Sequence, residues 1–320
     1  GSVPTCPITE GKAARIMTGA PVPEGADAII MHERTSFTEN TVTLTAPVTS
    51  ANIIPPGEDV AAGTLLVPKG KILTASDLAL IAGQGIAEIR VYKKLSIGLI
   101  STGSELLNTG SPLEYGKIYN TNPYLLGGYI QKHHMTANYL NTVSDDLDSL
   151  CQAVLEALKT NDIVITTGGV SAGDFDYMPE VIRRIGGDLL FHRLKFKPGG
   201  AMLGALKDGK VILGLSGNPG AAATGLLCVG FPFMRKLSGR SDITFSQTTA
   251  YLGVDFKKSS PVTRILKGHS DFRNGMLYFI PLSNQHNGSV SSMSDCDLLA
   301  VIPAGSEPLA AGDKLEIYIL

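Results

Sequence analysis

The most constraining feature of the sequence is one strand-and-glycine segment, Asp162-Ile-Val-Ile-Thr-Thr-Gly-Gly-Val-Ser-Ala-Gly-Asp-Phe-Asp-Tyr177. A short apolar strand, Asp162–Thr166, ends in two glycines, and a serine and two aspartates follow before an expected helix at Met178–Ile185. In an open α/β sheet, ligands bind beyond the carboxyl ends of the strands. Glycines let backbone N–H groups approach a ligand, and carboxylates can hold a cation or order the loop. We call Thr166–Tyr177 loop two and expect it to bind a ligand; the alternative is that an aspartate only caps the next helix.

Strand and helix patterns alternate between residues 95 and 240. This alternation predicts an α/β fold with a mostly parallel, three-layer sheet. Strands are expected at Leu95–Ser101, Thr136–Val143, Asp162–Thr166, Leu189–Leu194, Ala201–Ala205 and Val211–Leu215. Helices are expected from Asn122 to about His134, at Asp145–Lys159, and from Asn218 to about Leu237.

The flanking regions have different patterns, which predict four parts: 3–59, 60–94, 95–240 and 241–320. Residues 3–59 are read as a partial β-rich module, with strands at Ala14–Met17, Asp27–Glu33 and Thr41–Thr45. The connector, 60–94, carries a helix that starts at the capping sequence Thr74–Asp77 and then a strand, Ala87–Tyr92. Residues 241–320 show hairpin signals at Arg273–Gly275 and Asn287–Gly288, typical of a small barrel or sandwich; we expect a small C-terminal β-barrel.

Composition excludes several classes of protein. The 320 residues are 43% apolar and 18% charged, with a net charge of -2 and no basic run, so nucleic acid is not an expected partner. No apolar run reaches the roughly 20 residues of a membrane span. The four cysteines form no CxxC pair, which argues against a zinc knuckle or a disulfide framework. A cytoplasmic location is expected.

Two further loops follow predicted strands. Loop one, Ser101-Thr-Gly-Ser-Glu-Leu106, suits a phosphate or metal contact through backbone N–H groups, Thr102 and Glu105; the alternative is an ordinary β–α turn. Loop three, Leu215-Ser-Gly-Asn-Pro-Gly220, is expected to cap a helix with Asn218 and to offer free N–H groups to an anion, or simply to cap. Neither GxGxxG nor GxxxxGK[ST] occurs.

A lysine lies between loops two and three in the sequence, in Lys195-Phe-Lys-Pro-Gly-Gly200. Lys197 is expected either to bring a cation to the same crevice, where it would suit phosphate, or to be an ordinary solvated lysine.

Together these segments resemble the molybdopterin molybdotransferase family, which includes the E domain of gephyrin. The matching pieces come in the family's order and cover almost the whole chain: Arg15–Asp27, Pro56–Asp59, Ser101–Leu106, Ile118–Asn122, Thr167–Tyr177, Lys197–Gly199 and Gly217–Pro219. Loop two is also similar to that of the molybdopterin adenylyltransferases, which are single α/β domains without the flanking β modules.

The resemblance implies an elongated four-part subunit that forms a homodimer and inserts molybdate into adenylylated molybdopterin, with release of AMP and help from Mg²⁺. It implies that Ser171 and Asp176 lie at the molybdate pocket, with Lys197 near the pterin phosphate and molybdate, and that Glu105 lies at the Mg²⁺ site. Cofactor-binding positions implied by the motifs are Thr102, Gly103, Gly168, Gly169, Gly217, Asn218, Thr18 and Asp59. Thr18 and Asp59 fall on the β module, which by resemblance closes over the crevice from the partner subunit. A molybdopterin adenylyltransferase is an implied protein partner.

Several positions depart from the family pattern. They are Ser104 in place of an aspartate, Gly200 and Ala201 in place of Lys-Pro, Gly220-Ala221 where a serine is common, Pro55-Pro56 and His269 in place of arginines, and a missing N-terminal loop. Each charge-assisted hydrogen bond contributes roughly 1.5–3 kcal/mol. Two lost cations therefore imply about a hundredfold or more weaker molybdate binding. A pocket enlarged by Gly200 and Ala221 for another ligand is the alternative.

Three functions follow from these observations. The first is an active molybdotransferase with a remodelled pocket. The second is a catalytically impaired relative that binds molybdopterin or a partner protein as a scaffold. The third and weakest is an adenylyltransferase, which would consume ATP.

Overall fold

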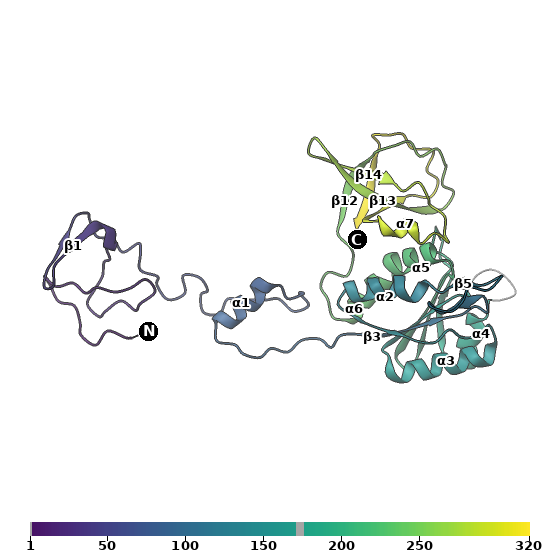
Figure 1. Cartoon of the computed structure of the whole chain (residues 1–320), viewed down its shortest axis with the longest axis horizontal. Helices are drawn as coiled ribbons and strands as arrows, with labels where there is room; N and C mark the ends of the chain where they lie inside the picture. Colours follow the sequence, from purple (N-terminus) through teal and green to yellow (C-terminus); the bar gives the residue numbers. More distant parts are fainter. Residues whose placement is uncertain (1, 171–175) are drawn as a thin grey trace. The chain divides into compact units, whose positions relative to one another are not determined.

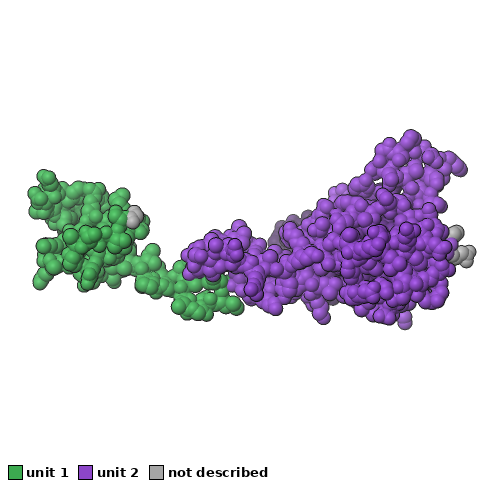
Figure 2. Space-filling model, turned by 90° about the horizontal axis from the view of Figure 1, so that it is seen from below, with its two compact units in different colours: residues 1–66 green, residues 67–320 purple. Residues whose placement is uncertain are grey.

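The structure is a computed structural model that describes residues 2–170 and 176–320. The predicted site residue Ser171 therefore lies outside the described residues. The chain forms two compact units, Gly1–Leu66 and Val67–Leu320, which are coloured differently in Figure 2. The predicted four-part division remains a prediction. None of the helices in the described part of the chain is both long and apolar enough to span a membrane.

The first unit has little regular structure. A 3₁₀ turn, His32–Arg34, leads into β1 (Thr35–Phe37), which pairs antiparallel with β2 (Val42–Leu44). A single bridge joins Ile29 to Thr49. The predicted strand Thr41–Thr45 contains β2, whereas strands at Ala14–Met17 and across Asp27–Glu33 are wrong. An extended segment becomes a strand only when a neighbour supplies its hydrogen bonds, and these segments have at most the one bridge.

The second unit begins with a capped helix, α1 (Ala75–Gly83). The predicted capping box is confirmed, because Asp77 N–H donates to Thr74 Oγ1 at 3.3 Å and Thr74 N–H donates to Asp77 Oδ2 at 2.9 Å. The predicted strand Ala87–Tyr92 is wrong: Ile89 and Val91 are exposed and this segment joins no sheet of the described chain.

A six-stranded sheet forms the centre of the second unit, in the order β6-β3-β7-β11-β10-β8. Its strands are β3 (Ser96–Ser101), β6 (Thr136–Tyr139), β7 (Ile163–Thr167), β8 (Asp188–His192), β10 (Leu203–Lys207) and β11 (Lys210–Leu215). The first four strands in sheet order are parallel to one another. The next strand, β10, pairs antiparallel with β11, and β8 pairs antiparallel with β10. The predicted, mostly parallel sheet is confirmed.

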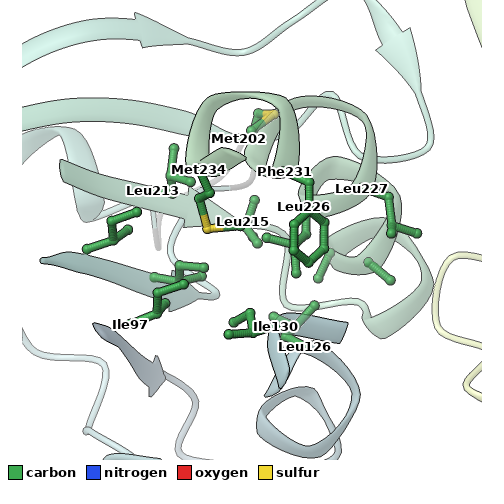
Figure 3. Packing of buried hydrophobic residues seen from close by; sticks show 14 of the residues in the cluster. Ile97, Leu126, Ile130, Met202, Leu213, Leu215, Leu226, Leu227, Phe231 and Met234 are labelled. Carbon is green, nitrogen blue, oxygen red and sulfur yellow. The ribbon is translucent and has the colours of Figure 1, made fainter. Parts of the chain in front are cut away.

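Helices cover both faces of this sheet (Figure 1). They are α2 (Asn122–Lys132), α3 (Leu147–Thr160), α4 (Met178–Arg184), α5 (Pro219–Gly225), a π-helical segment (Leu226–Gly230) and α6 (Phe231–Leu237). Successive strand residues face opposite layers. Ile97 packs in the cluster with Leu126 and Phe231 from α2 and α6 (Figure 3). Ile100 packs with Leu150 from α3 in the second hydrophobic cluster, which covers the opposite face of the sheet.

The C-terminal part is a closed five-stranded β-barrel, as predicted. Its strands are β12 (Gln247–Leu252), β13 (Thr263–Arg273), β14 (Met276–Pro281), β15 (Leu298–Ile302) and β16 (Lys314–Ile319). Closure occurs because β14 pairs with both β12 and β13. The turn Asn274-Gly275 is the predicted hairpin, with φ of 50° and 79°. The hairpin predicted at Asn287-Gly288 is wrong, because this turn leads to the short helix α7 (Ser291–Ser294).

Candidate functional site

Loops one, two and three follow neighbouring parallel strands, β3, β7 and β11. The strand register places Ser101 and Leu215 on either side of Thr167. Backbone bonds continue past the strand ends: Thr102 N–H donates to Thr167 O at 2.9 Å, and Gly168 N–H donates to Leu215 O at 3.0 Å. The three glycine-bearing loops therefore start at one edge of the sheet.

The loops also touch through their glycines. Gly168 has a φ of 99°, and a Cβ added there would lie 2.4 Å from Thr102 Oγ1. A Cβ on Gly217 would lie 3.6 Å from Gly168 Cα. Gly168 of loop two is thus packed between loops one and three, and only a glycine fits at this position.

A buried polar layer supports this edge. Thr167 Oγ1 donates to Ser101 Oγ at 3.2 Å, and Ser101 Oγ donates to Asn120 Oδ1 at 3.3 Å. Asn120 Nδ2 donates in turn to Thr142 Oγ1 at 3.2 Å. Because buried polar groups need partners, this chain of bonds fixes the side chains beneath the loops.

Asn122 links helix α2 to loop three. The N-cap of α2 is Thr121, and Asn122 Nδ2 donates to Gly217 O at 2.8 Å. Its Oδ1 atom is buried and has no hydrogen-bond partner among the described residues. The amide is a long-range connection that the sequence pattern alone did not indicate.

Loop one is held by its backbone, while its acid is exposed. Ser104 N–H donates to Asp145 Oδ2 at 3.2 Å, and Lys117 Nζ donates to Ser104 O at 2.6 Å. The carboxylate of Glu105 lies beside Gly103, 2.7 Å from the position a Cβ would take there. Across residues 2–170 and 176–320, no three His, Cys, Asp or Glu side chains form a ready metal site. Glu105 therefore suits Mg²⁺ only as one ligand among phosphate oxygens and waters, which is how Mg²⁺ is commonly bound.

Asp176, at the end of loop two, is paired with two residues that follow or end β8. Its Oδ2 atom lies 3.1 Å from Arg193 Nη2 and 3.3 Å from His192 Nε2. The side chain of Asp176 is 14% exposed and that of Arg193 is 48% exposed. The sequence pattern did not indicate Arg193, whose φ of 66° is unusual for a residue with a side chain. The carboxylate is thus balanced by the guanidinium of Arg193, which is still half exposed to solvent.

Loop three does not offer free N–H groups at the start of α5. Gly220 N–H and Ala221 N–H both donate to Asn287 O, at 2.8 and 3.3 Å, and Ala222 N–H donates to Asn218 O at 2.9 Å. Asn218 is the N-cap, as predicted. Of the two predicted uses of this terminus, the geometry favours capping, with the cap supplied by a carbonyl of the C-terminal barrel.

Lys197 lies on β9 (Phe196–Lys197), where its backbone pairs with Arg264 of β13. It is exposed and precedes a cis peptide bond to Pro198. The turn that follows packs on α5, because a Cβ on Gly199 would lie 2.9 Å from Ala221 O. The turn that follows Lys197 is thus packed against α5, the helix that starts in loop three.

The glycine and alanine departures do not enlarge a pocket. A Cβ on Gly200 would lie 2.3 Å from Phe196 O and 2.4 Å from Leu194 O, so neighbouring backbone fills that space. Ala221 is 4% exposed and packed within the core. The enlarged-pocket interpretation is therefore wrong for Gly200 and Ala221.

The remaining predicted residues lie elsewhere. Thr18 is exposed in a turn where Ala20 N–H donates to Met17 O at 3.0 Å, and Asp59 is also exposed. Both belong to the first unit, so their approach to the three loops remains a prediction. His269 is on β13 opposite Ile280. Among the described residues, no hydrogen bond or ion pair joins Glu105, Asp176 and Lys197 to one another, so their convergence on one cleft also remains a prediction.

Three protein-family models match successive parts of the chain. Residues 1–85 match the MoeA N-terminal region (domain I and II), residues 98–236 match a probable molybdopterin binding domain, and residues 249–320 match the MoeA C-terminal region (domain IV). Two crystal structures of the molybdopterin biosynthesis MoeA protein from Pyrococcus horikoshii superpose with TM-scores of 0.85 and 0.81. Each is 27% identical and covers 100% of this chain and 78% of the other.

Curated relatives are more similar in sequence. The molybdopterin molybdenumtransferase of Staphylococcus aureus (strain MRSA252) is 36% identical over 320 residues, which are 100% of this chain and 76% of the relative. That of Staphylococcus epidermidis (strain ATCC 12228) is 34% identical over the same lengths. The chain therefore belongs to the molybdopterin molybdenumtransferase family, the MoeA transferases of molybdenum cofactor biosynthesis.

Proposed function

We propose that this protein inserts molybdate into adenylylated molybdopterin and releases AMP, with Mg²⁺ as the metal cofactor. The observation that carries the proposal is the direct contact of three glycine-bearing loops at the ends of β3, β7 and β11. Ligands of open α/β sheets bind at such strand ends. Membership of the molybdopterin molybdenumtransferase family supports the choice of substrates.

In this proposal the loops hold the phosphates and the pterin. Their contact positions are Thr102, Gly103, Gly168, Gly169, Gly217 and Asn218. Glu105 is the Mg²⁺ ligand, and the metal when bound neutralises phosphate charge and polarises the bond that releases AMP.

In this proposal the molybdate oxyanion is held by two cationic side chains, Arg193 and Lys197. Arg193 and Lys197 are exposed and supply N–H donors, which suit a doubly charged oxyanion. Asp176 holds the guanidinium of Arg193 in place and balances its charge. Ser171 keeps its proposed place at the molybdate pocket on sequence grounds alone.

We further propose that the active form is a cytoplasmic homodimer. In it, Thr18 and Asp59 of one subunit would complete the site of the other. An adenylyltransferase would deliver the adenylylated substrate.

The decisive experiment follows AMP release from adenylylated molybdopterin. The expected result is AMP formation that requires both molybdate and Mg²⁺. No AMP at millimolar molybdate would overturn the proposal.

A scaffold that binds molybdopterin without turnover is the second candidate. Two observations favour it: Asn287 O already takes the amides of Gly220 and Ala221, and Ser104 supplies no carboxylate beside Glu105. Isothermal titration with molybdopterin alongside the AMP assay separates the two, because a scaffold gives binding and no AMP.

A further inference from the structure

Lys267 is a buried amine in the interior of the second unit. It lies on β13, its residue is 0% exposed, and Nζ donates to Ser292 Oγ at 2.5 Å and to His286 O at 3.2 Å. No carboxylate of the described chain forms an ion pair with it, and burial lowers the pKa of its amine. Burying an amine without a counter-charge is costly, and the hydrogen bonds to His286 O and Ser292 Oγ offset part of that cost. The segment that these two bonds hold is therefore the place to look for the role of Lys267.

The segment that Lys267 holds is the one that caps loop three. His286 and Ser292 flank Asn287, whose carbonyl accepts from the amides of Gly220 and Ala221. The next residue, Gly288, lies against loop three as well, since a Cβ there would be 3.6 Å from Asn218 Oδ1.

Gly220 shows how tightly these groups are fitted. A Cβ at this position would lie 2.9 Å from Asn287 O and 3.2 Å from Lys267 Nζ. The space beside the first turn of α5 is therefore filled by the Lys267 amine and the Asn287 carbonyl, and the barrel segment and loop three form one packed unit.

These contacts do not make an anion site. The amine is inaccessible, and the neighbouring amides already have an acceptor. The role that fits is mechanical: the amine fixes two points of the barrel segment, so that the carbonyl between them stays on the helix.

We propose that Lys267 is a positioning residue for loop three: its amine holds His286–Ser292 in place, and Asn287 O in turn holds the first turn of α5. The inference rests on the proposed function, in which loop three belongs to the molybdopterin site. It adds a residue of the C-terminal barrel that acts on that site through Asn287.

Hydrogen exchange in the full chain tests the contact directly. In Lys267→Met, the amides of Gly220 and Ala221 should exchange about tenfold faster, the scale expected for loss of one or two buried hydrogen bonds. Amides of β7 should keep their wild-type rates. Lys314→Met, which alters an exposed lysine of the same barrel, is the matched control and should change neither.

A second variant guards against poor folding of Lys267→Met. Ser292→Ala keeps the amine and its bond to His286 O, and should accelerate the same two amides by about threefold. Unchanged exchange at Gly220 and Ala221 in both variants overturns the proposal, as does a uniform acceleration that includes β7, because that would show a general loss of stability.

Turnover supplies an independent measure. Lys267→Met should raise KM for adenylylated molybdopterin about tenfold and leave kcat within about twofold, since the residue orders a binding loop and touches no reacting atom. A lowered kcat with unchanged KM would overturn the positioning role. If the wild-type chain forms no AMP, the proposed function fails, while the exchange result still decides whether Lys267 holds loop three.

Discussion

The hydroxyl of Thr102 occupies the space that any side chain at Gly168 would need. A Cβ at 168 would lie 2.4 Å from Thr102 Oγ1 and 2.9 Å from Thr102 O, and the backbone there has a φ of 99°. Loops one and two are thus fitted to each other by the absence of one methyl group. This contact links the fold to the site, because both loops follow strands that the core fixes.

Gly168→Ala should separate these two loops. The added methyl combines a steric clash with a strained φ, so we expect a loss of about 2 kcal/mol or more in the free energy of unfolding. Displacement of catalytic loops by about 1 Å can reduce turnover about hundredfold, and we expect a loss of that size in AMP release. Urea unfolding and the AMP assay measure the two effects.

The control is Gly209→Ala in the β10–β11 turn. Gly209 also has a positive φ, 75°, but a Cβ there meets nothing within 4 Å. It should cost about 1–2 kcal/mol from backbone strain alone and leave AMP release unchanged. Equal activity losses in the two variants would contradict the proposed fit of the loops.

Asn122→Asp should loosen loop three from α2. The substitution replaces the Nδ2 donor with an acceptor that faces Gly217 O, so a hydrogen bond of 2.8 Å becomes a repulsion. The expected cost is about 1–3 kcal/mol of stability, with a rise of about tenfold in KM for the pterin substrate. Asn108→Asp changes an exposed asparagine in the same way and should alter neither quantity. Wild-type KM in Asn122→Asp would show that this bond does not position the loop.

The sheet and the strand-end loops could be predicted because their signals are local. The apolar run before Gly168 and the alternation of strands with helices specify buried parallel strands, and parallel strands bring their following loops to one edge. The same reasoning failed for Ala87–Tyr92, since a single segment carries no information about whether a partner strand exists.

The contacts within the site were not predictable in the same way. Asp176 with Arg193, and Asn287 with Gly220, are pairs that tertiary folding brings together from separate elements. A capping motif such as Asn218-Pro219 signals a helix start, but it does not show which carbonyl will occupy the free amides. Lys267 looked like any strand lysine because burial is a property of the assembled barrel.

Asp176→Asn should impair catalysis more than stability. It removes the charge that holds Arg193, whose Nη2 atom donates to Asp176 Oδ2 at 3.1 Å. With Arg193 misplaced, kcat/KM for molybdate-dependent AMP release should fall about tenfold to a hundredfold. The free energy of unfolding should change by about 1 kcal/mol, because Arg193 is nearly half exposed and the pair is partly screened.

Asp208→Asn is the matched control for that experiment. Asp208 is 81% exposed, and in the part of the chain that the structure describes its ion pair is with Lys207 alone. Its kcat/KM should equal that of the wild type. A wild-type kcat/KM in Asp176→Asn would remove Asp176 and Arg193 from the proposed oxyanion site.

His133 should make the stability of the fold depend on pH. Its ring packs against Phe231, with centroids 4.4 Å apart, and Nδ1 lies 3.3 Å from Arg235 Nη2. Burial, and then the positive charge of Arg235, lower the pKa of His133 to about 4. An unfolded histidine has a pKa of about 6.5, so between these values the unfolded chain binds more protons than the folded one.

The contribution of neutral His133 to the free energy of unfolding should therefore be fully present above about pH 6.5, and it should fall as the pH is lowered toward 4. Urea unfolding at a series of pH values measures this slope. His133→Gln should flatten it between pH 6.5 and 4, although its stability at pH 7 is lower because the ring contacts are lost. His134→Asn replaces the neighbouring exposed histidine, whose φ of 63° asparagine tolerates, and should keep the wild-type slope. An unaltered slope in His133→Gln would place the pH dependence on other groups.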